Sequence, residues 1–195
     1  MKIGLIRAVA CAATVGMAAI AAPVQAQITA NVYSGFVRHG GISNDGTPFT
    51  GLLCTFSISS INYSTFSPHT ISPGCPAGPG QSNTEYGVQF TGFLSTVGGS
   101  QTFTLNSDDG SGLFIDGNSI IQNGGDHVAV SKSATTNLAA GTHAFTLNYY
   151  EINGDPAVIQ LGLQNASYTT PEPSSMALLG TGLIGLVPMV RRRRK

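Results

Sequence analysis

Residues 101–122 read QTFTLNSDDGSGLFIDGNSIIQ, and this stretch decides the fold class. Phe103 and Leu105 alternate with polar residues, which is the period-two pattern of a strand with one buried face. Asp116-Gly117 separates two short apolar runs and is a strong hairpin signal, because both residues tolerate positive φ. The stretch therefore predicts antiparallel strands joined by tight turns.

The same pattern extends outward in both directions along the chain. Alternating apolar residues mark further strands at 145–149 and 159–163. Other short candidates, bounded by Gly, Asn, Asp and Ser, are residues 28–37, 51–57, 86–94, 112–115, 119–122 and 127–131. No segment between residues 27 and 168 predicts a helix. Many short strands with frequent turns predict an all-β antiparallel sandwich.

The N-terminal segment is typical of a secretory signal peptide at residues 1–26. Lys2 and Arg7 precede a run of small apolar residues, and Val24-Gln25-Ala26 forms a small-x-small cleavage site. A retained membrane anchor is the alternative, but the apolar run is shorter than the ~20 residues that a span needs. We expect the exported chain to begin near Gln27.

The C-terminal segment, residues 169–195, has the pattern of a membrane anchor. An apolar stretch at 176–190 follows Pro171-Glu172-Pro173 and ends at the basic run 191–195. A cationic cluster beside an apolar helix stays in the cytoplasm, so this order predicts a C-terminal transmembrane helix with the body of the protein outside.

The exported body is acidic and low in charge. Residues 27–170 keep two basic residues, Arg38 and Lys132, against eight acidic ones, a net charge of −6. Nucleic-acid binding depends on many phosphate-neutralising cations, so it is excluded as a function. The length is enough for one domain, which we expect at residues 27–168.

Cys54 and Cys75 are the two cysteines of the exported body. An oxidising compartment favours a disulfide between them, which would close a loop of about 20 residues and contribute roughly 3 kcal/mol. Two separate thiols are the alternative, because spacing alone does not show that their α-carbons approach each other.

The densest polar cluster is Ser107-Asp108-Asp109-Gly110-Ser111, between two predicted strands. Adjacent carboxylates repel each other unless a cation or hydrogen-bond donors compensate. Calcium binds six to eight oxygen ligands, and a second polar loop could add Asn153 and Asp155. The alternative is an acidic turn in which the aspartates cap backbone amides.

Other candidates for chemistry are weaker. His127 and His143 are better explained as structural residues than as metal ligands. Tyr149 and Tyr150 alternate on one predicted strand, so we expect one in the core and one exposed. A glycosidase needs two carboxyl groups facing across a groove, and the spacing here does not support that arrangement. We therefore expect a protein that is not an enzyme.

The tail resembles the PEP-CTERM sorting signal of bacterial exported proteins. The resemblance rests on Pro171, Glu172 and Pro173, the apolar helix and the terminal arginines. It implies recognition by an exosortase in a Gram-negative bacterium, and release or re-anchoring of the body at the cell surface.

Residues 87–163 resemble the protective-antigen (PA-fourteen) domain family. The resemblance is carried by TFTLNSDDGSGLFIDG, by the Leu-x-x-Gly-x-His segment at 138–143 and by the Tyr-Tyr-Glu strand at 149–151. It implies a β-sandwich that binds carbohydrate, and paired aspartates, often joined by a cis peptide, that hold calcium.

Carried over to this chain, the resemblance makes Asp108 and Asp109 calcium ligands and Asn153 a further one, with Asp155 in the same ligand-binding loop. Two sugar hydroxyls would complete the shell of the ion. The sequence thus predicts a cell-surface or extracellular carbohydrate-binding module whose partner is a glycan or extracellular polysaccharide. The alternative is a structural matrix or biofilm protein without a ligand site.

Overall fold

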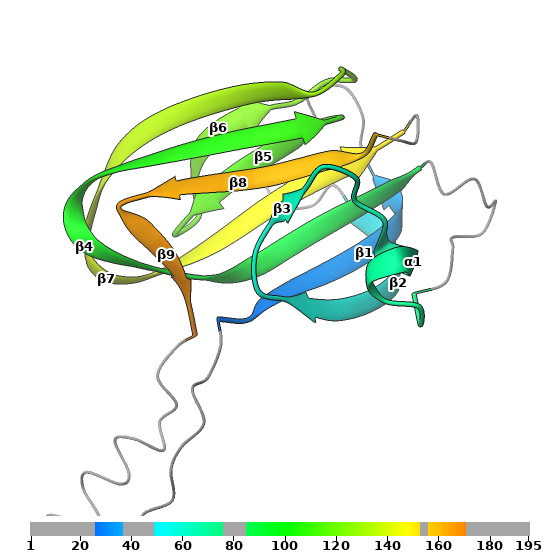
Figure 1. Ribbon diagram of the computed structural model, residues 1–195, viewed down its shortest axis with the longest axis horizontal. Coiled ribbons are helices and arrows are strands. Elements are labelled where there is room, and N and C mark those ends of the chain that lie inside the picture. The colour runs from blue at the N-terminus through cyan, green and yellow to red at the C-terminus, as the bar shows by residue number, and fades with distance from the viewer. Residues whose placement is uncertain (1–25, 37–48, 76–84, 153–155, 171–195) are drawn as a thin grey trace, which may run out of the picture.

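The computed structural model describes residues 26–36, 49–75, 85–152 and 156–170, which form nine strands and one short helix (Figure 1). In chain order they are β1 (Ile28–Phe36), β2 (Phe49–Ile58), β3 (Asn62–Tyr63), α1 (Pro68–Ile71), β4 (Tyr86–Asp108), β5 (Ser111–Ile115), β6 (Asn118–Asn123), β7 (Val130–Glu151), β8 (Val158–Gln164) and β9 (Ala166–Thr169). Every strand pairing among them is antiparallel.

The long strands β4 and β7 organise the sandwich. They have 23 and 22 residues and pair from Tyr86↔Glu151 to Ser107↔Val130. Both strands curve, so each contributes to two layers (Figure 1). One layer has the order β2-β1-β4-β7-β5-β6, and in the other β8 lies between the second half of β4 and β3. The predicted antiparallel β-sandwich is confirmed.

The prediction of separate strands at 86–94 and 101–106 is wrong, because both belong to β4. Gly98 and Gly99 have φ of +86° and +88°, and pairing with β7 continues on either side of them. The glycines bend the strand between the layers without ending it. The strand predicted at 127–131 likewise begins only at Val130 and continues through β7.

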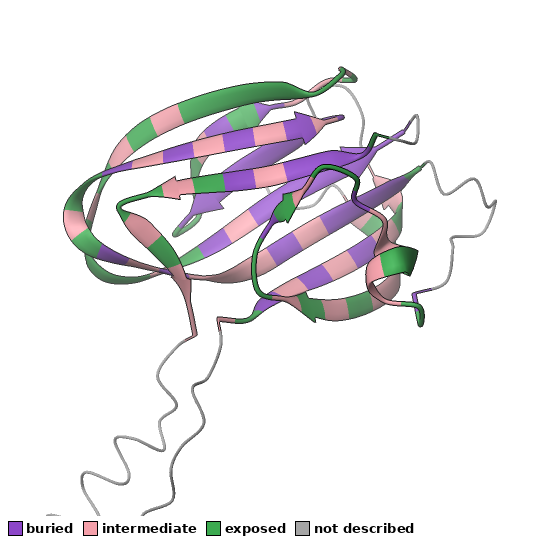
Figure 2. Ribbon diagram, viewed as in Figure 1, coloured by how far each residue is buried: buried purple, intermediate pink, exposed green. Residues whose placement is uncertain are grey.

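The core lies between the two layers, and burial alternates along the strands that enclose it (Figure 2). The predicted alternation is borne out, since Phe103 and Leu105 point inward between partly exposed threonines. The largest fully buried apolar side chains include Phe66, Phe90, Phe103, Leu105, Leu113 and Tyr149. This core fixes the ends of β4 and β7, where the polar cluster lies.

The expectation that one of Tyr149 and Tyr150 is exposed is wrong. Both are buried, at 0% and 1% exposed. Tyr149 enters the main core, whereas Tyr150 packs with Phe114 and Ile152 in a second small cluster, its ring stacked on Phe36 at 5.3 Å. This end of β7 is therefore covered on both faces.

The disulfide between Cys54 and Cys75 is formed, with the two α-carbons 5.2 Å apart. It ties β2 to the segment that follows α1. The one-turn helix α1 was not predicted, but its start has local causes. Ser67 accepts a hydrogen bond from the Thr70 N–H, and Pro68 occupies the first turn.

Two predicted segments lie outside the described residues: nearly all of the signal peptide (residues 1–25), and the sorting motif Pro171, Glu172 and Pro173 with the apolar helix after it. Within the described ranges, no helix has the length and apolar character that crossing a membrane requires.

Candidate metal centre

The site lies where the chain crosses from one layer to the other. β4 ends at Asp108, opposite Val158 of β8, and β5 begins at Ser111, opposite Tyr149 of β7. Only Asp109 and Gly110 connect these strands. The peptide bond between Asp108 and Asp109 is cis, as the family resemblance implied.

Gly110 is required here because the backbone passes close to a ring. A Cβ at this position would lie 2.5 Å from Cε1 of Tyr150. The Gly110 carbonyl also accepts a hydrogen bond of 2.9 Å from the Tyr150 N–H. The loop therefore rests directly on the end of β7.

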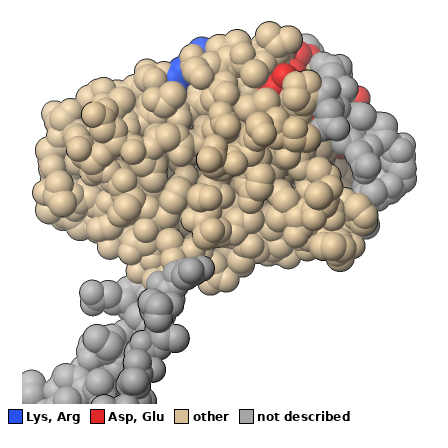
Figure 3. All heavy atoms as spheres, in the orientation of Figure 1, with Lys and Arg blue, Asp and Glu red and all other residues tan. Residues whose placement is uncertain are grey.

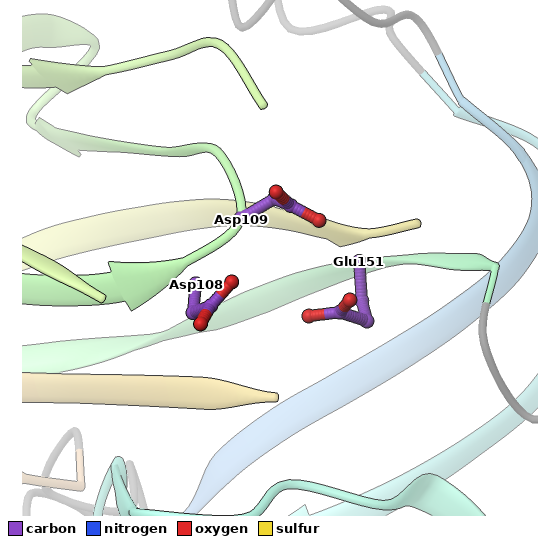
Figure 4. A group of neighbouring side chains, drawn as sticks. All are labelled: Asp108, Asp109 and Glu151. Atoms are coloured by element: carbon purple, nitrogen blue, oxygen red, sulfur yellow. The ribbon is translucent and has the colours of Figure 1, made fainter. Parts of the chain in front are cut away.

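This contact brings a third carboxylate to the two aspartates. Asp108, Asp109 and Glu151 each offer an oxygen within 4.8 Å of the others. Figure 4 shows the three side chains facing a common space. We call this group the acidic corner.

Sequence reasoning missed Glu151 as a ligand, although one signal was present. Glu151 continues the inward alternation of Leu147 and Tyr149, so period two already placed a carboxylate on the core side of the strand. A charged group in that position needs a partner, and this requirement could have identified it.

Backbone donors hold the buried carboxylates in place. The N–H of His127 donates to Asp109 Oδ1 at 2.9 Å, and the N–H of Ile152 donates to Asp109 Oδ2 at 3.1 Å. The same Ile152 N–H lies 3.1 Å from Glu151 Oε1. Asp109 and Glu151 are only 1% and 0% exposed, so their orientation is fixed before any ligand arrives.

Tyr149 links the two sides of the acidic corner. Its hydroxyl lies 2.6 Å from the Asp108 carbonyl oxygen and 3.0 Å from Glu151 Oε2. Burial, followed by the neighbouring Tyr86 and Glu151, raises the pKa of this phenol, so it remains a hydrogen-bond donor. Tyr149 thus positions both a carbonyl and a carboxylate.

A second polar network lies behind the aspartate loop. The hydroxyls of Ser107 and Ser111 are 2.6 Å apart, and the Asn123 amide donates to Ser107 Oγ at 2.9 Å. All three residues are buried. They connect the end of β4 to the start of β5 and so fix the width of the aspartate loop.

The electrostatics of the acidic corner favour a cation. Burial and the Asp109 carboxylate raise the pKa of Asp108, against the lowering effects of the Ala129 N–H and His127. Lys132 is the one Lys or Arg among the described residues, and its ammonium group donates to the Gln122 carbonyl. The three carboxylates offer only oxygen atoms as metal ligands, and such ligands suit a hard divalent ion such as calcium.

The remaining predicted ligands, Asn153 and Asp155, lie outside the described residues. Asp116 is in the predicted hairpin turn, where it and Gly117 have φ of +50° and +78°. Its carboxylate contacts His143 Nδ1 at 2.6 Å and accepts from the Ala144 N–H at 3.0 Å. This pair, at the other end of β5, is separate from the acidic corner.

Comparisons with known proteins agree with this geometry. The family model described as the PA14 domain matches residues 71–176, and that of the PEP-CTERM protein-sorting motif matches residues 169–195. No curated protein sequence matches the chain.

Solved structures show the same fold. The PA14 domain of the antifreeze protein MpAFP is 16% identical, with a TM-score of 0.55 and coverage of 80% of this chain and 100% of that one. The PA14 sugar-binding domain of an RTX adhesin is 17% identical, with a TM-score of 0.53 and coverage of 72% and 90%.

A domain of the GH31 α-xylosidase of Xanthomonas citri is also similar, at 21% identity and a TM-score of 0.51 over 75% of this chain. The chain spans only 14% of the length of that enzyme. The two family matches, the cis Asp108–Asp109 peptide and the antiparallel sandwich agree with one another. The chain belongs to the PA14 domain family and carries a PEP-CTERM protein-sorting motif.

Proposed function

We propose that the exported domain is a carbohydrate-binding module that uses a calcium ion held by Asp108, Asp109 and Glu151. The observation that carries the proposal is the convergence of these three carboxylates within 4.8 Å, two of them buried. Burying like charges together is unfavourable, and a divalent cation offsets that cost. Asn153 remains a proposed further ligand, with Asp155 beside it.

Calcium is preferred to a transition metal because of the donor set. The acidic corner offers carboxylate oxygens and no sulfur, and hard cations prefer such ligands. An ion of high coordination number keeps positions for two vicinal sugar hydroxyls. In this proposal Asp108, the most exposed of the three acids, borders the sugar, while Asp109 and Glu151 lie beneath the ion.

The similar RTX adhesin domain is a sugar-binding domain, and this supports the ligand class proposed for this chain. Hydrolysis is not proposed. A glycosidase separates its two carboxyl groups across the substrate, whereas the three acids here face one space. The α-xylosidase matches over a small part of its length, so its activity is not carried over.

The PEP-CTERM match indicates an exported protein of Gram-negative bacteria. We propose that residues 1–26 are removed on export and that residues 27–168 form the binding domain. Residues 169–195 would hold the chain in the inner membrane, with a cytoplasmic C-terminus, until an exosortase processes it. The module would then act at the cell surface or in extracellular polysaccharide.

The test is a thermal melt of residues 27–170, first with EDTA and then with millimolar calcium. A ligand that binds only the folded state raises stability by about 2.7 kcal/mol at a hundredfold excess over Kd. We expect a rise of several degrees that is lost in Asp109→Asn and Glu151→Gln. Glu85→Gln removes an exposed acid outside the acidic corner, so it should keep the response.

A calcium response should be followed by a glycan array probed with and without EDTA. Binding that disappears with EDTA would support the full proposal. A melt that calcium leaves unchanged would instead favour a structural matrix or biofilm protein without a ligand site. Release of reducing sugar from a polysaccharide panel would contradict the assignment as a binding module.

A further inference from the structure

The outward face of the layer formed by β3, β8, β4 and β7 carries uncharged hydroxyl and amide groups along most of its length, up to Asn106 of β4, two residues before Asp108. Strand register places Asn62, Gln160, Asn106 and Ser131 in one row across four strands. Two further rows follow along the strands. We call these ten residues the polar face: Asn62, Thr102, Thr104, Asn106, Ser131, Ser133, Thr135, Gln160, Gly162 and Gln164.

Side-chain hydrogen bonds orient the amides of the first row. The Asn106 amide donates to Gln160 Oε1 at 3.0 Å, and the Gln160 amide donates to Asn62 Oδ1 at 3.2 Å. This directional chain leaves Asn106 Oδ1 as an acceptor at one end and Asn62 Nδ2 as a donor at the other. A ligand with many hydroxyl groups both donates and accepts, so it matches both ends.

The hydroxyls of the other rows are paired in the same way. Thr104 Oγ1 lies 2.8 Å from Ser133 Oγ, and Thr102 Oγ1 lies 2.9 Å from Thr135 Oγ1. Each pair uses one hydrogen between two oxygens, which leaves one hydroxyl hydrogen for a ligand. Because the groups stand on paired strands, their spacing is fixed in advance.

A groove of about 380 Å³ lies at the first and second rows. Its polar border includes Asn62, Gln160 and Asn106. The other lining residues are Ser60, Ile61, Thr104, Ser131, Leu161, Gly162 and Tyr168. Gly162 has no side chain to fill the space, and the nearest atom to a Cβ there would be Thr104 Cβ at 3.5 Å. An extended chain can therefore lie against the strands at this point.

The charge distribution selects the class of ligand. Figure 3 shows acidic atoms gathered at one corner and a wide uncharged surface beside it. Charged residues make up 9% of the whole chain, and the ten residues of the polar face include none. The ten residues include none of the Trp, Tyr and Arg side chains that anchor protein partners, and none of the cations that bind anionic polymers. Tyr168 of β9 borders the groove beside them.

We propose that the polar face binds a neutral polysaccharide chain without calcium, as a second site separate from the acidic corner. The ligand shares only its chemical class with the proposed function. The polar face contains no carboxylate, so EDTA should leave this binding intact.

The experiment is native affinity electrophoresis of the full-length chain in EDTA and a zwitterionic detergent. The gels contain hydroxyethyl cellulose, galactomannan or dextran as neutral probes, and alginate as the anionic probe. We expect retardation by at least one neutral polymer and none by alginate. Gln160→Ala breaks the amide chain and should weaken binding about tenfold, and Thr104→Arg should block the groove.

Gln89→Ala is the matched control, because Gln89 is a partly buried glutamine that donates to Asn148 in the other layer. It should bind like the unchanged protein. Equal retardation of Gln160→Ala and Gln89→Ala, with Thr104→Arg unaffected, overturns the polar face as a site. Absence of retardation in all three neutral gels overturns it too, whatever calcium does in the thermal melt.

Discussion

An aspartate lies at each end of β5, and the two carboxylates are surrounded by different compensating groups. At the end that contains Asp109, two further carboxylates approach and backbone N–H groups are the main donors. At the other end, Asp116 has an imidazole at 2.6 Å. At the Asp116 turn a protonated His143 can compensate the carboxylate, whereas in the proposed function a calcium ion from solution compensates the acidic corner.

The imidazole of His143 is well placed for that role. Its Nδ1 faces the Asp116 carboxylate, and its Nε2 lies 3.0 Å from the Ala139 carbonyl oxygen. Both neighbours are acceptors, so both ring nitrogens must carry hydrogen to satisfy them. The hydrogen bonds from Asp116 and Ala139 accordingly raise the pKa of His143. Asp116 and His143 therefore satisfy each other as a structural pair.

The largest effect expected at the acidic corner follows from Gly110→Ala. The new methyl would meet the buried ring of Tyr150 at 2.5–2.8 Å, and overpacking of this kind costs about 1–3 kcal/mol. Urea unfolding in EDTA should show this loss, and the calcium response should fall with it.

Gly117→Ala is the matched change at the other end of β5. No atom lies within 4 Å of a Cβ there, but φ is +78°, so the cost is the strain of one residue, about 1 kcal/mol. Its calcium response should be normal. An equal loss of the response in both variants would mean that the two ends of β5 are not independent.

Tyr149→Phe should have the next largest effect. It removes a buried hydroxyl from the Asp108 carbonyl and from Glu151, and an unsatisfied buried acceptor costs about 1–3 kcal/mol. Chemical denaturation in EDTA measures the loss in free energy of unfolding. A calcium titration of the same variant measures how far the calcium affinity depends on this hydroxyl. Weaker calcium binding with unchanged stability would show that Tyr149 serves the ion alone.

Asp116→Asn tests the pair formed by Asp116 and His143. A raised folded pKa of His143 means that the pair stabilises the fold below the unfolded value near 6.5. That stability is lost as pH rises through the folded pKa. Because Asp116 is 46% exposed at its side chain, we expect about 0.2–1 kcal/mol, measured as urea stability between pH 5 and 8. The variant should lose this pH dependence.

The smallest effect belongs to Asp108, in a lower pH range. Its folded pKa is raised mainly by burial, so the protonated form favours folding and stability falls as pH rises above the ordinary value of 3.8. Calcium should flatten this decline, because the ion favours the carboxylate. Melts at several acidic pH values, with EDTA and with calcium, compare the slopes, and parallel slopes would argue against Asp108 as a ligand.

The sequence was sufficient for the fold class because alternation survives wherever one strand face is buried. Strand ends were predicted wrongly near Gly98, Gly99 and Gly141. The sequence alone does not distinguish a glycine that bends a strand from one that ends it. The strands β3 and β9 were missed because two and four residues are too short to show a period.

The sequence predicts one part of the candidate site, the two aspartates, and misses the other, Glu151. The adjacent aspartates stand out as a local pattern, and the resemblance adds the cis peptide. Glu151 joins them only through strand pairing 43 residues later in the chain, a long-range contact that local pattern does not show. The polar face was missed for the same reason, because its rows exist only once four strands are in register.

The pairing of β1 and β9 along one edge of β4 has a consequence for how this domain can be joined to other chains. Thr29 lies opposite Thr91, and Thr169 lies opposite Phe93, so the two ends of the fold meet the same strand two residues apart. A unit whose ends are neighbours can be inserted into a surface loop of a host protein with little distortion. The domain could therefore be carried by a host protein, and the acidic corner, at the other end of β4 from these pairings, would lie away from the point of insertion (Figure 1).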